Sequence, residues 1–231
     1  MSASNSLHCI NKYLSPDKCI LAPTLDSTLG CSCVMLKEAK NTTKKGTLEK
    51  LRLKYVGENI VVYAIDEALE KPYPYRRKSF KHPKVFSNIL KTVPEIHSPC
   101  DYLIFLLVGN KLNVIQCELK SKTVGECISK FKATKCFIEY VKSIIVNFED
   151  ACPVYYGNTF KYLKVLVRLS DEMTPCSLHN NGTYPSGQID KGYIFSKKDD
   201  INIFAIGQDK IRNNAFEINW KYMLQDLRIT V

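Results

Sequence analysis

The sequence lacks an apolar run long enough to cross a bilayer. Its longest apolar stretch, Tyr102–Val108, falls far short of the roughly 20 residues that a membrane-spanning helix needs. Residues 1–11 are polar and rich in serine, and no charged segment followed by an apolar run indicates a secretory signal there. These absences lead us to expect a cytoplasmic protein with no membrane partner.

Acidic residues are also in short supply. The chain has 23 Asp and Glu against 33 Lys and Arg, which gives a formal net charge of +10 over 231 residues. A basic balance of this size favours an anionic partner, of which nucleic acid is the most common. A basic solvated surface has the same composition, so the charge alone does not identify a partner. The hydrophobic fraction of 45% is typical of a globular protein and excludes a disordered one.

Cysteine is abundant, with ten residues, and an even number invites a disulfide interpretation. Several of the cysteines fall inside expected strands and helices, where a free cysteine packs as a small buried hydrophobe. Together with the expected cytoplasmic location, this favours reduced thiols. Cys31-Ser-Cys33 lacks the two-residue spacing of a zinc knuckle and has no matching His/Cys pair, so its pattern does not favour a structural zinc site.

Hydrophobic periodicity predicts a mixture of strands and helices. The sequence contains no internal repeats and no low-complexity tracts. The expected strands are 51–55, 60–65, 101–108, 111–120, 162–169 and 201–206, and a polar loop is expected at 173–192. An amphipathic helix is expected at 123–146, with an apolar stripe at Val124, Cys127, Ile128, Phe131, Thr134, Ile138, Val141 and Ile145. The order strand, strand, helix, strand favours an α/β or α+β domain.

A hairpin is expected around Gly109-Asn110, because glycine accepts the positive φ that a tight turn needs. A two-residue turn pairs Val108 with Lys111, and counting outward sets Asp101 opposite Glu118. A turn one residue longer would move Asp101 out of this register.

Residues two apart on a strand share a face, so Gln116, Glu118 and Lys120 are expected on one side of the second strand. Carboxylates opposed across two strands repel unless a cation, a shared proton or a nearby lysine neutralises them. Mg²⁺ prefers oxygen ligands, and Asp101, Glu118 and the carbonyl of Leu119 supply them, while Gln116 would extend the site. Lys120 would orient or deprotonate the attacking water or stabilise the developing charge.

Pro99-Cys100-Asp101, sixteen intervening residues, Glu118-Leu119-Lys120 and a following amphipathic helix resemble the PD-(D/E)xK nuclease superfamily. The resemblance covers residues 95–146, with one residue between Pro99 and Asp101 where the motif has none. It implies a restriction-endonuclease-like mixed central sheet flanked by helices, with Asp101 and Glu118 as metal ligands and Lys120 as the catalytic lysine.

The resemblance also implies an upstream acidic ligand, for which Glu49, Glu58, Glu67 and Glu70 are all open candidates. It suggests that the helix presents basic residues to the site or the substrate, and the candidates are Lys130, Lys132 and Lys135.

Other basic residues are candidates for nucleic-acid binding. Residues 73–81 interleave Tyr73 and Tyr75 with Arg76, Arg77 and Lys78, a composition that suits phosphates and bases. The alternative is a solvated loop. The helix lysines have the same alternative, a solvated face, and Glu-x-Lys on a strand is often a surface ion pair.

We expect one nuclease-like domain over residues 1–231, with a core motif region at 95–146 and less certain additions at 1–50 and 170–231. The expected activity is that of a Mg²⁺- or Mn²⁺-dependent endonuclease that hydrolyses phosphodiester bonds in DNA. Chains of this type often act as effectors of anti-phage defence, and double-strand cleavage would favour a homodimer. The alternative is a non-catalytic nucleic-acid-binding or interaction protein that retains the fold.

Overall fold

The computed structural model describes residues 4–14, 20–28, 30–37, 48–65, 99–109, 111–120, 127–148, 160–170, 191–207, 210–212 and 215–230. The chain forms two compact units. The first comprises 1–22, 58–118 and 125–164, and the second comprises 23–57, 119–124 and 165–231. The single-domain assignment stays a prediction.

The first unit is built on a sheet whose strands follow the order β1, β5, β6, β7 and β8. These strands are β1 (Ile20–Leu21), β5 (Ile60–Ala64), β6 (Tyr102–Val108), β7 (Lys111–Lys120) and β8 (Phe160–Ser170). The pairs β1–β5, β5–β6 and β6–β7 are antiparallel. The second half of β8 belongs to the second unit, where the order continues through β10 to β9.

The turn between β6 and β7 has the expected register. Gly109 has φ +56°, Val108 pairs with Lys111, and the pairing continues to Tyr102 opposite Cys117. One further step outward sets Asp101 opposite Glu118, so the predicted register is confirmed.

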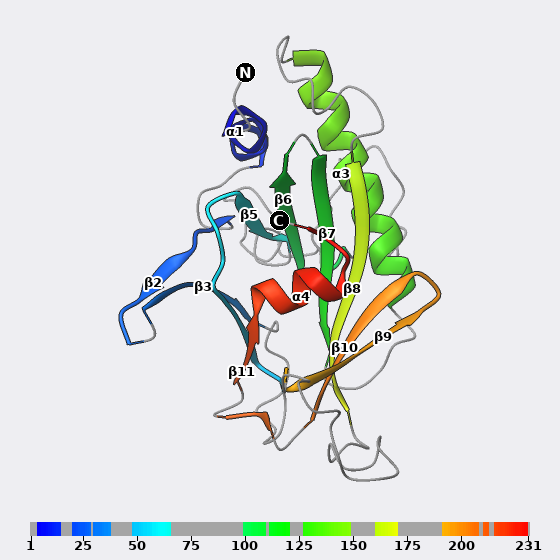
Figure 1. Ribbon diagram of the computed structural model, residues 1–231. Coiled ribbons are helices and arrows are strands. Elements are labelled where there is room, and N and C mark those ends of the chain that lie inside the picture. The colour runs from blue at the N-terminus through cyan, green and yellow to red at the C-terminus, as the bar shows by residue number, and fades with distance from the viewer. Residues whose placement is uncertain are drawn as a thin grey trace, which may run out of the picture. The chain divides into compact units, whose positions relative to one another are not determined.

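Two helices of the first unit, α1 (Ser4–Tyr13) and α3 (Cys127–Phe148), contribute to the core on one face of this sheet (Figure 1). The strand side chains of this core, including Leu103, Phe105, Leu112 and Val114, are the apolar residues of the face that ends in Glu118. The stripe predicted for α3 is buried at Cys127, Phe131, Thr134, Ile138, Val141 and Ile145. Ile128 was wrongly assigned to it, since 47% of this side chain is exposed. Val124 lies outside the described residues.

The second unit contains a sheet of four strands in the order β11, β4, β3, β2. The strands are β2 (Thr24–Asp26), β3 (Cys31–Lys37), β4 (Lys50–Lys54) and β11 (Ala215–Asn219). β11 and β4 are parallel, and the other two pairs are antiparallel. One face is apolar, with the buried side chains of Val34, Leu36, Leu51, Leu53, Phe216 and Ile218. The opposite face is polar.

A hairpin of β9 (Tyr193–Lys198) and β10 (Ile201–Gly207) also belongs to this unit. Asp199 and Asp200 form its turn, with φ of 47° and 64°. The short helix α4 (Trp220–Asp226) follows β11 directly, and the side chain of Asn219 caps it by accepting the backbone N–H of Lys221.

The fold class is α+β, as predicted, and strands dominate. The six predicted strands are found with small shifts of their ends, but 51–55 and 60–65 belong to different sheets. Strands β1, β2, β3, β9 and β11 and helices α1 and α4 were not predicted. None of the helices in the described part of the chain is long and apolar enough to span a membrane.

Candidate carboxylate–lysine site

Asp101 and Glu118 meet at the end of the β6–β7 hairpin. The backbone N–H of Asp101 donates to Oε2 of Glu118 over 3.2 Å. Both residues are buried, with 7% of Asp101 and none of Glu118 exposed. Carboxylates in such positions require compensation, because an ionised group loses its hydration on burial.

Lys130 supplies part of that compensation from the first turn of α3. Its ammonium lies 2.6 Å from Oε1 of Glu118 and 3.6 Å from Oδ1 of Asp101. The three residues are called the carboxylate cluster below. Among the alternatives that the sequence left open for neutralising the two acids, a nearby lysine is therefore present. From the sequence, Lys130 was predicted only as one of several basic residues that the helix presents to the site or the substrate.

Thr134 connects helix α3 to the chain just before strand β6. Its hydroxyl donates to the carbonyl of Lys130 and accepts the backbone N–H of Cys100, both over 2.8 Å. The hydroxyl therefore ties the residue before Asp101 to the turn of α3 that carries Lys130. Sequence reasoning placed Thr134 in the apolar stripe but missed this role, for which a polar residue within that stripe was the available signal.

Cys100 and Cys117 flank the carboxylates and are fully buried. Burial, reinforced by the negative charges of Asp101 and Glu118, raises the pKa of both thiols well above the ordinary value. The sulfur of Cys100 also contacts the carbonyl oxygen of Tyr102 at 3.2 Å. Both cysteines stay protonated at neutral pH, as suits packing groups rather than nucleophiles.

Gln116 lies two residues before Glu118, so it shares that face of β7. Its side chain is fully buried, and neither its Nε2 nor its Oε1 has a hydrogen-bond partner within the described ranges. A buried amide without partners costs free energy, so this position calls for an explanation.

The structure leaves several predicted residues untested. Lys120 is on β7, but its side chain is outside the described part, as are Arg76, Arg77 and Lys78. The side chain of Leu119 is buried. Lys132 and Lys135 are exposed on α3, with the Lys135 ammonium 5.4 Å from the ring centre of Tyr162.

The upstream acid stays a prediction. Over the described residues, no group of three or more His, Cys, Asp or Glu side chains is placed to hold one metal ion. Glu58 is exposed and Glu49 is partly buried, while Glu67 and Glu70 lie outside the described residues.

No protein-family model matches the chain, and neither a curated protein nor a solved structure does.

The arrangement can bind a cation between two carboxylates. The Lys130 ammonium already lies within ion-pair distance of oxygens from both strands, so Asp101 and Glu118 converge on one point. Oxygen ligands converging in this way suit Mg²⁺ or Mn²⁺, and the same oxygens suit a permanent lysine ion pair.

Proposed function

We propose that the chain is a metal-dependent nuclease that hydrolyses phosphodiester bonds, with DNA as its substrate and a restriction-endonuclease-like core. One observation carries the proposal: Asp101 and Glu118, in cross-strand register at the end of a buried face, share one cation. Charged residues at the end of such an apolar face need a reason, and a catalytic centre is one.

Asp101 and Glu118 would hold Mg²⁺ or Mn²⁺, together with the carbonyl of Leu119. The metal would polarise the phosphoryl group and lower the pKa of a bound water. Lys120, two residues after Glu118 on β7, would orient or deprotonate that water. Lys130 would stabilise negative charge on the phosphate, because its ammonium is held beside the carboxylates by the tie between Thr134 and Cys100.

The basic balance of the chain supports an anionic polymer as substrate. The exposed Lys132 and Lys135 lie two and five residues after Lys130 on α3, where they would contact backbone phosphates. Arg76, Arg77 and Lys78 would add to this surface. A role in anti-phage defence and a homodimeric state belong to the same proposal.

The test is a cleavage assay on plasmid DNA, linear DNA and RNA, with and without Mg²⁺ or Mn²⁺. The key variant is Glu118→Gln, which keeps the side-chain volume but removes the charge. Its matched control is Glu217→Gln, the same change in an exposed ion pair of the other unit.

We expect metal-dependent cleavage of DNA by the wild type and by Glu217→Gln, and at least a 100-fold loss in Glu118→Gln, on the order of a removed catalytic group. Circular dichroism establishes that each variant is folded. Full activity of a folded Glu118→Gln variant would show that this site does not cut.

A second candidate is a non-catalytic nucleic-acid-binding protein. The 2.6 Å contact between Lys130 and the fully buried Glu118 favours it, because this ion pair neutralises the acid without a metal. This candidate predicts salt-sensitive binding without cleavage under any divalent metal, and equal binding by wild type and Glu118→Gln.

A further inference from the structure

Two buried cysteines lie on the charged face of the four-stranded sheet. Cys31 and Cys33 share one face of β3, and their partners across the ladders are Asp26 on β2 and Lys54 on β4. Arg52 and Glu217 lie on the same face. The opposite face holds the apolar core of the unit, so these thiols are outside it although each residue is only 5% exposed.

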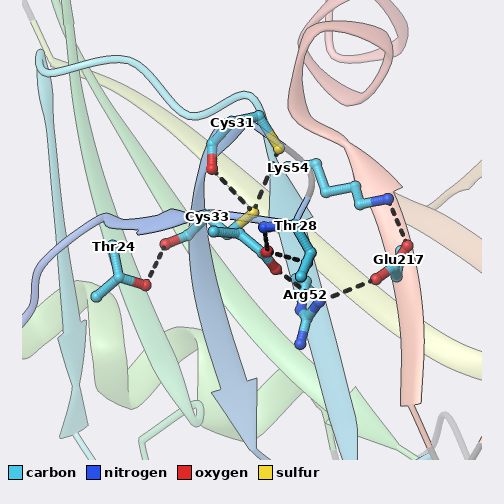
Figure 2. A network of polar contacts seen from close by, with 8 residues as sticks. Thr24, Thr28, Cys31, Cys33, Arg52, Lys54 and Glu217 are labelled. Atoms are coloured by element: carbon cyan, nitrogen blue, oxygen red, sulfur yellow. Dashed lines mark hydrogen bonds and ion pairs between the residues drawn. The ribbon is translucent and has the colours of Figure 1, made fainter.

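The charged side chains around the cysteines form a connected network, shown in Figure 2. Arg52 contacts Asp26 at 3.1 Å and Glu217 at 3.2 Å, and Lys54 contacts Glu217 at 2.5 Å. Asp26, Arg52, Lys54 and Glu217 are called the sheet-face cluster below. The charges of its two cations and two anions sum to zero. The cluster as a whole therefore does not repel a further neutral or singly charged group beside the thiols.

The two sulfur atoms point toward one another and are 3.6 Å apart (Figure 2). Two thiolates bound tetrahedrally to one ion at a metal–sulfur distance of about 2.3 Å are about 3.8 Å apart. A disulfide needs about 2.05 Å and a Cα separation of at most about 6.8 Å. Residues two apart on a strand are already separated by about 6.4–6.8 Å. The spacing therefore suits one shared ion better than a sulfur–sulfur bond.

The surroundings hold the Cys33 thiol in its protonated form, so a bound ion would have to displace that proton. Burial, followed by the neighbouring Cys31 and Asp26, raises the pKa of the Cys33 thiol to about 11, while Arg52 lowers it. Binding of one soft ion would form two metal–sulfur bonds and release two protons to solvent.

We propose that Cys31 and Cys33 form a thiolate site for a soft metal ion, Zn²⁺ or Cu⁺, on the charged face of the four-stranded sheet. Thiolate ligands select these ions over Mg²⁺. The site is independent of the carboxylate cluster, which lies in the other unit and offers oxygen ligands.

The experiment titrates the full chain, under reducing conditions, with Zn²⁺ alone, Cu⁺ alone and Mg²⁺ alone in separate arms. The variants are Cys31→Ser and Cys33→Ser, and the control is Cys136→Ser, which removes an exposed thiol on α3. We expect Zn²⁺ or Cu⁺ to bind the wild type and Cys136→Ser alike, and each of the other variants to lose one bound ion or bind it at least tenfold more weakly. Mg²⁺ should not distinguish the four proteins.

A measurement on the wild type alone guards against misfolded variants. Thiol alkylation followed by peptide mass analysis should show that the bound ion protects both Cys31 and Cys33. The proposal is overturned if these two thiols gain no protection, if folded Cys31→Ser and Cys33→Ser bind the ions as the wild type does, or if a disulfide forms in place of metal binding.

Discussion

The carboxylate cluster and the sheet-face cluster use the same chemistry in different surroundings. The first joins two carboxylates to one lysine, and the second joins two carboxylates to an arginine and a lysine, all at ion-pair distances. In the first, the exposed fraction of the side chain is 0% for Glu118, 9% for Asp101 and 17% for Lys130. In the second, it is 19% for Lys54, 20% for Asp26, 33% for Arg52 and 44% for Glu217, so the clearest difference is between Glu118 and Glu217.

Burial decides how much each cluster matters. A solvated ion pair contributes about 0–1 kcal/mol, because water already stabilises both charges. Removing one partner of a buried pair leaves the other charge without compensation and costs about 3–5 kcal/mol. Substitutions in the carboxylate cluster are therefore expected to have the larger effect on stability, on function or on both.

The largest effect is expected from Lys130→Met, which keeps the length of the side chain but removes its charge. We expect a loss of about 3–5 kcal/mol in the free energy of unfolding, measured in urea at neutral pH, because two buried carboxylates lose their ammonium. If the two carboxylates also accept a divalent ion, millimolar Mg²⁺ should restore part of this loss.

The matched control is Lys132→Met, an exposed lysine on the same helix, for which a change within about 0.5 kcal/mol is expected. Equal stability of the two variants would contradict a stabilising role for the buried ion pairs of Lys130.

The next largest effect is expected from Thr134→Val, which is nearly isosteric. The buried N–H of Cys100 loses its acceptor, so the unfolding free energy should fall by about 1–3 kcal/mol. Thr134→Ser keeps the hydroxyl and should be less affected. On the sheet face, Thr24→Val breaks only a long 3.4 Å contact to the carbonyl of Cys33 and should change little. A Thr134→Val variant as stable as Thr24→Val would contradict the tie between α3 and β6.

These pairs show how far the sequence predicts the site. The position of Asp101 opposite Glu118 followed from local rules, because a two-residue turn fixes the register of its hairpin. The contact of Lys130 with Glu118 could not be derived, since it depends on the rotation of α3 over the sheet. That rotation results from the packing of the whole apolar stripe, and the exposure of Ile128 shows that spacing alone misplaces the edge of this stripe.

The fold of the second unit was less predictable for a related reason. Arg52 and Glu217 are 165 positions apart, and they meet because β4 and β11 are parallel neighbours. No local pattern specifies such a pairing. Strand β3 was not predicted either, because the sequence up to about residue 46 mixes short apolar pieces with turn residues such as Pro23 and Gly30.

A third prediction separates stability from function within the first unit. Gln116→Leu replaces a buried amide, whose polar atoms have no partner among the described residues, with an apolar group of similar size. We expect the unfolding free energy to be unchanged or to rise by about 1 kcal/mol. If Gln116 extends the catalytic site, cleavage should fall in the same variant. A clear loss of stability would instead indicate a buried partner for this side chain, such as an ordered water.

The smallest effect is expected from Glu217→Gln in the sheet-face cluster. Because solvent and salt screen its pairs, the unfolding free energy should fall by at most about 1 kcal/mol, and less at high ionic strength.

The hydrogen bond to Glu217 raises the pKa of Lys54, whose ordinary value is 10.5, so the folded chain holds this proton more tightly than the unfolded chain does. The contribution is therefore complete below pH 10.5 and is lost as the pH rises through the raised pKa. Urea titrations across this range should show a steeper decline for the wild type than for Glu217→Gln. Parallel declines would mean that the pair contributes nothing, and a loss as large as that of Lys130→Met would mean that exposure does not separate the two clusters.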